Sequence, residues 1–373
     1  MKSSLRDILK LTKDPQLVKA LITKIKQLLS GIERPLKIME FCGGHTHSLL
    51  KFGLDEALKP EIEFLHGPGC PVCVLSLERL NLALKIAQEK EIIFTTYGDL
   101  MRVPNSEGIS LLSLRAKGKD IRMVSNAMEA LSLAKENPKR LVIFFALGFE
   151  TTTPQTAFLL ERVRTENIPN LKIISNHMLT PSVLEYLLSK YGVYMDGILG
   201  PGHVSAVIGA SSYEGIAQKF ALPIVISGFD PLDILLAVKL LCEKILRKEK
   251  GVYIAYERAV TYEGNLKAKE LIQKVFKVRE SFSWRGLGEV PKSGLSIKEE
   301  YEELDGEKIF ESIPENKEVS KGCLCGTILQ GRAKPPDCKL FGKVCTPSTP
   351  IGPCMVSSEG ACLAYFKYKG PLS

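Results

Sequence analysis

Eight short apolar runs, each followed by a polar or glycine-rich turn and then in most cases by a helical pattern, dominate the first two thirds of the chain. The runs cover residues 36–41, 61–65, 92–96, 121–124, 141–147, 171–175, 197–199 and 223–227. Regular alternation of buried strands with helices is typical of parallel sheets covered on both faces. Because eight strands suffice for two sheets of four, we predict an α/β fold with two Rossmann-like domains whose parallel sheets face a cleft.

A chain of 373 residues is too long for a single core, so several structural units are expected. We predict an N-terminal helical segment over residues 1–30, one α/β domain over 31–138 and a second over 139–260. Residues 261–373 are predicted to form an irregular C-terminal domain with an iron–sulfur cluster. Its last fifty residues are rich in Cys, Gly and Pro and have few apolar residues in any period. Such a segment usually needs a metal or crosslinks to hold it together.

The composition is that of an ordinary globular protein, with 45% hydrophobic and 25% charged residues. The net charge of +8 could suggest a nucleic-acid partner, but lysines alternate with glutamates along the predicted helices and aromatic residues make up only 7%. Apolar runs such as 141–148 are too short to span a membrane. We therefore expect a cytoplasmic protein with neither a nucleic-acid nor a membrane partner.

The first apolar run ends in a motif that reads F-C-G-G-H-T-H over residues 41–47. This places Cys42 after a strand and before a helix, where ligands bind in open α/β sheets. Glycines allow close backbone approach, and the N-terminus of a helix favours a thiolate. We interpret Cys42 as a reactive or metal-binding thiol. The alternative is a buried cysteine beside two hydrogen-bonded histidines.

All five histidines of the chain lie on turns that follow the predicted strands: His45, His47, His66, His177 and His203. Such turns converge on one edge of a parallel sheet, so we expect the histidines to share a functional cleft. Glu150, in G-F-E-T-T-T, is the acidic candidate at the same edge. It could orient a histidine or relay a proton, or it could merely complement the dipole of a following helix.

Ten cysteines in a cytoplasmic protein indicate metal or redox chemistry more than structural disulfides. Cys70 and Cys73 form a C-x-x-C at a strand-to-helix junction, and this spacing favours a redox-active dithiol. Metal ligation and inert packing remain open for this pair. Cys242 lies on the apolar face of a predicted helix and is expected to be buried and inert.

The other six cysteines fall in the irregular C-terminal segment. Cys323, Cys338, Cys345 and Cys362 are separated by 14, 6 and 16 residues. Four thiolates in such a segment suit a [4Fe–4S] cluster or a structural zinc, and the spacing does not choose between them. Cys325 and Cys354 would be left as a possible second dithiol beside the metal.

Taken together, F-C-G-G-H-T-H, G-P-G-C-P-V-C, G-F-E-T-T and the C-terminal cysteine spacing resemble the HypD family of hydrogenase maturation factors. The resemblance runs in order from Phe41 to Cys362. It implies an iron–sulfur protein on which the Fe(CN)2CO group of [NiFe]-hydrogenases is assembled. It also implies a small HypC-like chaperone as partner, and a HypE-like partner that donates cyanide from a protein thiocyanate, with a HypF-like carbamoyl transferase upstream.

The resemblance also implies roles for individual residues. Cys42 would hold the iron of Fe(CN)2CO jointly with a cysteine of the chaperone, and Cys70 and Cys73 would form a thiol–disulfide pair. Cys323, Cys338, Cys345 and Cys362 would hold the [4Fe–4S] cluster, with Cys325 and Cys354 as a possible second pair. His45 and Glu150 are expected to position the diatomic ligands or supply protons, with Thr46, His47 and His203 around them.

Two other functions account for part of the pattern. A cluster-dependent thiol–disulfide reductase would explain the cluster and the C-x-x-C pair but not Cys42 with its histidines. An interaction scaffold held together by a zinc ion on four cysteines would explain only the C-terminal segment.

Overall fold

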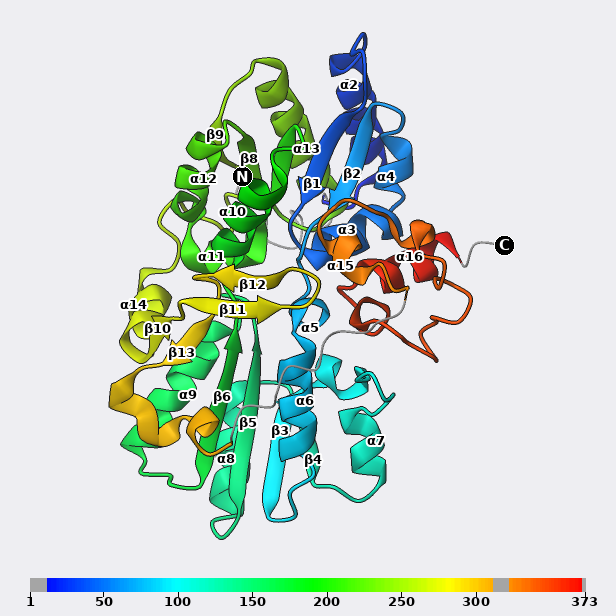
Figure 1. Ribbon diagram of the computed structural model, residues 1–373. Helices are drawn as coiled ribbons and strands as arrows, with labels where there is room; N and C mark the ends of the chain where they lie inside the picture. The colour runs from blue at the N-terminus through cyan, green and yellow to red at the C-terminus, as the bar shows by residue number, and fades with distance from the viewer. Residues whose placement is uncertain (1–11, 311–321, 371–373) are drawn as a thin grey trace.

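The computed structural model describes residues 12–310 and 322–370. Two parallel sheets form its centre and lie end to end along the long axis of the molecule (Figure 1). The first sheet has the strand order β2-β1-β7-β8-β9, and the second has the order β4-β3-β5-β6. All pairings within both sheets are parallel. The strands of the two sheets are β1 (Leu36–Glu40), β2 (Ile62–His66), β3 (Ile92–Tyr97), β4 (Ile121–Val124), β5 (Leu141–Gly148), β6 (Leu171–His177), β7 (Gly197–Pro201), β8 (Pro223–Ser227) and β9 (Gly251–Ile254). The predicted α/β class with two parallel sheets is therefore confirmed, with β9 as a ninth strand.

Helices connect successive strands and cover the faces of the sheets. They are α2 (Pro15–Leu28), α3 (Gly43–Lys51), α4 (Leu54–Ala57), α5 (Pro71–Val74), α6 (Leu77–Ile86), α7 (Leu111–Ala116), α8 (Ala127–Glu136), α9 (Thr153–Thr165), α10 (Thr180–Tyr191), α11 (Gly202–Ile208), α12 (Glu214–Lys219), α13 (Pro231–Leu246) and α14 (Leu266–Val275), with 3-10 turns η1 (Gly98–Arg102) and η2 (Ala210–Tyr213). The N-terminal helix α2 packs on α13, which follows β8. Residues 1–11 of the predicted N-terminal segment lie outside the described residues.

The sheets do not divide the chain at residue 138. Strands β1 and β2 pair with β7–β9, whereas β3 and β4 pair with β5 and β6. The predicted boundary between residues 138 and 139 falls inside the second sheet, between β4 and β5. The chain leaves the first sheet after β2, builds the whole second sheet, and returns after β6. Periodicity shows that a run is a strand but not which partner it chooses, because partner choice depends on the packing of the completed sheet.

The C-terminal third adds small antiparallel sheets that the sequence reading did not predict. Strands β10 (Phe276–Val278) and β13 (Leu295–Ile297) form one pair, and β11 (Ser281–Trp284) and β12 (Gly288–Pro291) form a hairpin. The hairpin lies between the two large sheets (Figure 1). Its Trp284 is buried, and the indole N–H donates to Ser293 Oγ at 2.8 Å. An indole inside a core needs such a partner.

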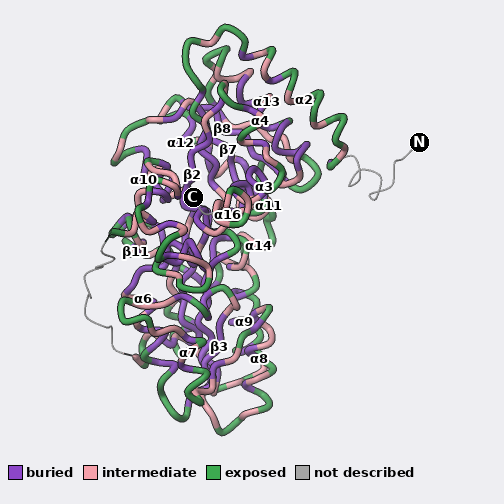
Figure 2. Tube along the Cα trace, turned by 90° about the vertical axis from the view of Figure 1, so that its right-hand side faces the viewer, coloured by how far each residue is buried: buried purple, intermediate pink, exposed green. Residues whose placement is uncertain are grey.

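After the hairpin come two 3-10 turns, and then the cysteine-rich segment, which contains little regular structure. Its elements and the preceding turns are η3 (Glu299–Leu304), η4 (Gly306–Lys308), α15 (Cys325–Leu329), η5 (Pro335–Asp337), η6 (Pro353–Met355) and α16 (Ala361–Lys369). Helix α16 packs against α3, so the end of the chain lies beside the Cys42 turn. Buried positions run continuously through both halves of the molecule and into this segment (Figure 2). Within the described residues, no helix combines the length and the apolar character that crossing a membrane requires.

Candidate functional site

A cavity of about 500 Å³ lies where the carboxyl ends of the two sheets face each other. It is lined by turns that follow β1, β2, β3, β4, β5 and β7 and by one residue of the C-terminal segment: Cys42, Gly69, Pro71, Val72, Tyr97, Gly98, Asp99, Leu100, Met123, Val124, Ser125, Leu147, Gly148, Phe149, Thr151, Thr152, His203, Val204 and Glu359. Ligands bind at this edge of open α/β sheets. The expected cleft between two parallel sheets is therefore present, and Cys42 is on its wall.

Cys42 is the N-cap of α3 and is partly exposed. Burial of its sulfur, with Glu359 and Glu40 nearby, raises the pKa of the thiol well above its usual range. The amides of Gly44 and His45 act in the opposite direction but are weaker. The N-terminus of the helix acts on the thiol in the expected direction, but burial outweighs it. A cation or metal at the sulfur would reverse this balance, since metal binding displaces the thiol proton.

His45 lies immediately behind the cavity wall. Its Nε2 donates to the carbonyl oxygen of Gly228 at 3.0 Å, and its ring stacks on Phe229 at 4.8 Å. The ring of His203 also stacks on Phe229, with ring centroids 4.0 Å apart. Burial lowers the pKa of His45 to about 4, so the imidazole is neutral at physiological pH. Phe229 was not singled out from the sequence, although it follows the β8 strand at the same edge.

The five histidines do not line one cleft. Only His203 lines the cavity, and His45 is next to it. His66 faces Glu40 and Tyr365 behind the Cys42 turn, and His47 contacts Tyr368. His177 ends β6 in the second sheet, where its ring meets Phe276 and burial lowers its pKa to about 3. The turns follow strand ends as predicted, but they belong to two different sheets and the side chains leave them in different directions.

Glu150 lies on the turn after β5 but does not point into the cavity. Its two carboxylate oxygens accept the backbone N–H and the hydroxyl of Thr180, each at 2.7 Å. Thr180 is the first residue of α10, so the carboxylate sits at the N-terminus of that helix. Burial raises the pKa of Glu150 to about 7. Glu150 does not line the cavity that contains Cys42.

Two carboxylates that the sequence reading missed do reach the cavity. Asp99 follows β3 and accepts the hydroxyl of Ser357 at 2.9 Å. Glu359 packs so closely on the Cys42 turn that a Cβ at Gly43 would lie 2.3 Å from its carbonyl oxygen. The position of Asp99 on a strand-end turn was a usable signal. Glu359 had none, because nothing in the sequence places residue 359 beside residue 43.

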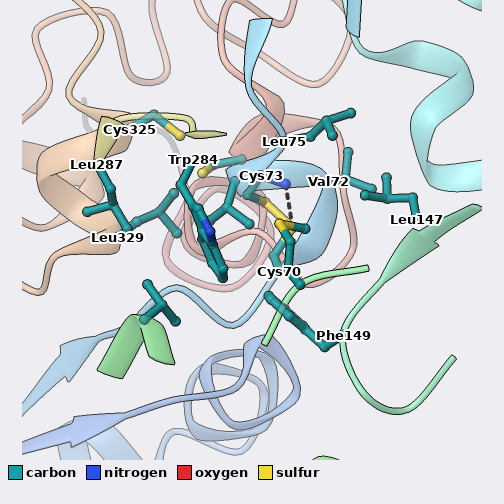
Figure 3. Close-up of a cluster of buried hydrophobic side chains, with 14 of the residues drawn as sticks. Cys70, Val72, Cys73, Leu75, Leu147, Phe149, Trp284, Leu287, Cys325 and Leu329 are labelled. Carbon is teal, nitrogen blue, oxygen red and sulfur yellow. Dashed lines mark hydrogen bonds between the residues drawn. A yellow bond between two sulfur atoms is a disulfide. The ribbon is translucent and has the colours of Figure 1, made fainter. Parts of the chain in front are cut away.

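Cys70 and Cys73 form a disulfide under a hydrophobic cover. Both residues are buried, and Figure 3 shows them in one cluster with Trp284, Phe149 and Cys325. The rings of Phe149 and Trp284 stack at 6.0 Å. The disulfide agrees with a thiol–disulfide couple, which is one of the three interpretations left open for this pair.

The six C-terminal cysteines line one small apolar cavity together with Ile328, Leu340, Phe341, Gly352 and Met355. The cysteines are Cys323, Cys325, Cys338, Cys345, Cys354 and Cys362. No group of three or more His, Cys, Asp or Glu side chains in the described ranges is spaced to hold a single metal ion. The backbone N–H of Ile351 points at Cys345 Sγ at 3.4 Å. Cysteine thiols, apolar walls and an N–H donor to sulfur fit the donor set of an iron–sulfur cluster.

The cysteines are arranged as a continuous series from the cleft to this cavity. Gly69 packs on the backbone of Cys42 and is followed directly by Cys70. Helix α5, which contains Cys73, packs on η6, which contains Cys354. Cys242, in contrast, is buried in α13 within the core of the first sheet, as predicted.

Comparison with known proteins decides the family. Residues 16–369 match the HypD family model, whose description reads "Hydrogenase formation hypA family". The chain belongs to the HypD family. It is 46% identical over 341 residues to "Hydrogenase maturation factor HypD2" of Bradyrhizobium diazoefficiens, with 90% of each chain covered. It is 44% identical over 354 residues to "Hydrogenase maturation factor HypD" of Escherichia coli, with 95% of each chain covered. The family predicted from the motifs is therefore confirmed.

Proposed function

We propose that this protein is a hydrogenase maturation factor that serves as the scaffold and redox centre for assembly of the Fe(CN)2CO group. The observation that carries the proposal is the series of cysteines just described: one thiol on the cleft wall, a disulfide behind it, and six cysteines around one cavity behind the disulfide. Membership of the HypD family supports the same role.

Cys42 is proposed to hold the iron, which is cargo and not a resident cofactor. A thiolate is a soft ligand and suits iron that carries cyanide and CO. Because Cys42 is on an open cavity of about 500 Å³, a second thiolate from a HypC-like chaperone could reach the same iron. His203 forms one wall for the small ligands, and its ring stacks on Phe229 behind it. His45 is fixed to the same turn through Gly228.

The Cys70–Cys73 pair is proposed to supply reducing equivalents. A HypE-like partner would present cyanide as a protein thiocyanate, downstream of a HypF-like carbamoyl transferase. Breaking the S–CN bond takes two electrons and gives a thiolate and cyanide. A dithiol yields two electrons and two protons when it closes to the disulfide. Asp99 and Glu359 border the same cavity and are placed to accept those protons.

Cys323, Cys338, Cys345 and Cys362 are proposed to hold a [4Fe–4S] cluster, with Cys325 and Cys354 as a thiol pair between it and the disulfide. When bound, the cluster would supply single electrons for reopening the disulfide. The packing of α5, which contains Cys73, on η6, which contains Cys354, supports this order. Figure 3 shows Cys325 in the same buried cluster as the disulfide. Glu150 is proposed to act by fixing α10 and the turn that holds Phe149.

The proposal is tested by expressing the protein in a host that lacks its own HypD and measuring hydrogenase activity and iron content. Cys323→Ala should lose the visible cluster absorption and hydrogenase maturation together. Cys242→Ala is the matched control, because Cys242 is a buried cysteine far from the series, and this variant should keep both. Full maturation by a colourless Cys323→Ala protein would contradict the proposed electron route.

A cluster-dependent thiol–disulfide reductase is the second candidate, favoured by the packing of α5, which contains Cys73, on η6, which contains Cys354. It predicts that Cys42→Ala retains function, whereas the scaffold requires Cys42. A zinc-stabilised scaffold predicts a colourless protein with one zinc per chain by elemental analysis.

A further inference from the structure

Helix α16 connects the six-cysteine cavity to the Cys42 turn. Cys362 lies in its first turn and lines the cavity. About one turn further, the hydroxyl of Tyr365 contacts His66 Nε2 at 3.1 Å. About two turns further, the hydroxyl of Tyr368 contacts His47 Nε2 at 3.0 Å. Residues three apart share one side of a helix. Helix α16 thus carries one cysteine of the six-cysteine cavity and two tyrosines that contact histidines beside the Cys42 turn.

The contact of Tyr365 continues as a chain of hydrogen bonds to Cys42. His66 Nδ1 lies 2.8 Å from Glu40 Oε1. Glu40 Oε2 accepts the backbone N–H of Cys42 at 3.1 Å, and Oε1 also accepts the hydroxyl of Thr46. The carboxylate therefore holds both ends of the first turn of α3. When His66 donates from Nδ1 to Glu40, its Nε2 is free to accept the Tyr365 hydroxyl proton, which completes the chain.

Because these hydrogen-bonded groups are buried, loss of any one of them should disturb the others. Glu40 is fully buried and His66 is 3% exposed. A buried carboxylate is tolerated only while its hydrogen-bond partners are in place, and partly satisfied networks are costly. Removing the Tyr365 hydroxyl would leave His66 Nε2 unpaired and allow the imidazole to turn away from Glu40.

We propose that Tyr365 is a positioning residue for Cys42, acting through His66 and Glu40 to fix the turn on which the thiol sits. The inference rests on the proposed function only in treating Cys42 as the working thiol. Helix α16 thereby sets the geometry of the cleft thiol from the side of the six-cysteine cavity. Tyr368 lies on the same helix but contacts His47, and within the described residues His47 makes no hydrogen bond to Glu40.

The test is the rate at which iodoacetamide alkylates Cys42 in the full-length protein, followed by mass spectrometry of the Cys42 peptide. Tyr365→Phe should raise this rate at least about threefold, because a loosened turn makes more accessible a thiol that is now only partly exposed. Tyr368→Phe removes one hydroxyl from the same helix and should leave the rate within about 1.5-fold of wild type. In the complex with a HypC-like chaperone, Tyr365→Phe should also shift the cyanide stretching bands.

An unchanged alkylation rate in Tyr365→Phe would overturn the proposal. Equal acceleration in both variants would also overturn it, since docking of α16 and not the hydrogen-bond chain would then control the turn. The alkylation result does not depend on hydrogenase assembly. A protein that shows the predicted rates but never carries cyanide bands would therefore contradict the proposed function while supporting the positioning role.

Discussion

Gly69 lies directly against Cys42: a Cβ placed on Gly69 would be 2.4 Å from the Cα of Cys42. The two turns after β1 and β2 are further joined by the bond from Gly43 N–H to the carbonyl oxygen of Gly69, at 3.2 Å. No side chain fits between these backbones. The reactive thiol and the C-x-x-C pair are thus held together by backbone contact and not by long side chains.

Gly69→Ala is therefore expected to push the two turns apart and to abolish maturation while most of the fold remains. The methyl group must displace backbone atoms, which cannot rotate away as a flexible side chain can. Gly215→Ala is the control, because a Cβ there meets nothing within 4 Å. That change lies in α12 and should stabilise the protein by about 0.5–1 kcal/mol. Maturation activity and circular dichroism measure both effects, and normal activity in Gly69→Ala would refute the close-contact argument.

Stability should depend on pH through Glu150. Its pKa is raised from 4.5 to about 7 in the folded protein, so folding favours the protonated carboxyl group. The stabilisation is present below the unfolded pKa and is lost as the pH rises toward and through 7. Glu150→Gln cannot ionise. Relative to this variant, the wild type should lose about 3 kcal/mol of unfolding free energy between pH 4.5 and pH 8.

Urea unfolding at the two pH values measures this difference, with exposed Glu257→Gln as the control. Parallel pH profiles for wild type and Glu150→Gln would mean that Glu150 is not held in its buried, Thr180-bonded position. If Glu150→Gln folds well but loses maturation, the result would favour a direct chemical role for the carboxyl group over its role in holding the N-terminus of α10.

Trp284 should protect the Cys70–Cys73 disulfide. Trp284→Ala removes a buried indole and is expected to cost about 3–5 kcal/mol of stability. It should also speed reduction of the disulfide by dithiothreitol, since the cover over the sulfurs is lost. Trp284→Phe keeps an aromatic ring against Phe149 and should show smaller changes in both measurements. Reduction at the wild-type rate in folded Trp284→Ala protein would exclude this protective role.

The strands and the site turns could be predicted because each is a local signal. An apolar run followed by a cysteine, glycine or histidine turn identifies the end of a strand, and parallel strands bring such ends together. Cys42, Cys70 and Cys73 were found in this way. The strand pairing and the residues from the C-terminal segment could not be predicted, because they depend on contacts between residues far apart in sequence. The pairing of β1 with β7 joins residues far apart in sequence, and Glu359 reaches Gly43 only because α16 docks on α3.

The direction in which a side chain points could not be predicted from the sequence either. Glu150 and His177 are on the predicted edge, but one turns toward Thr180 and the other toward Phe276. The hairpin that contains Trp284 was not predicted, because its short strands gain their stability by packing between the large sheets and not from an alternating pattern.

The central claim, that Cys42 holds the iron of a growing Fe(CN)2CO group, is tested most directly by infrared spectroscopy. The protein is purified anaerobically in complex with its HypC-like chaperone, as wild type and as Cys42→Ala. The wild type should show cyanide and CO stretching bands. Cys42→Ala should lose them while keeping the visible absorption of the cluster. Cyanide and CO bands of undiminished intensity in Cys42→Ala would contradict the account.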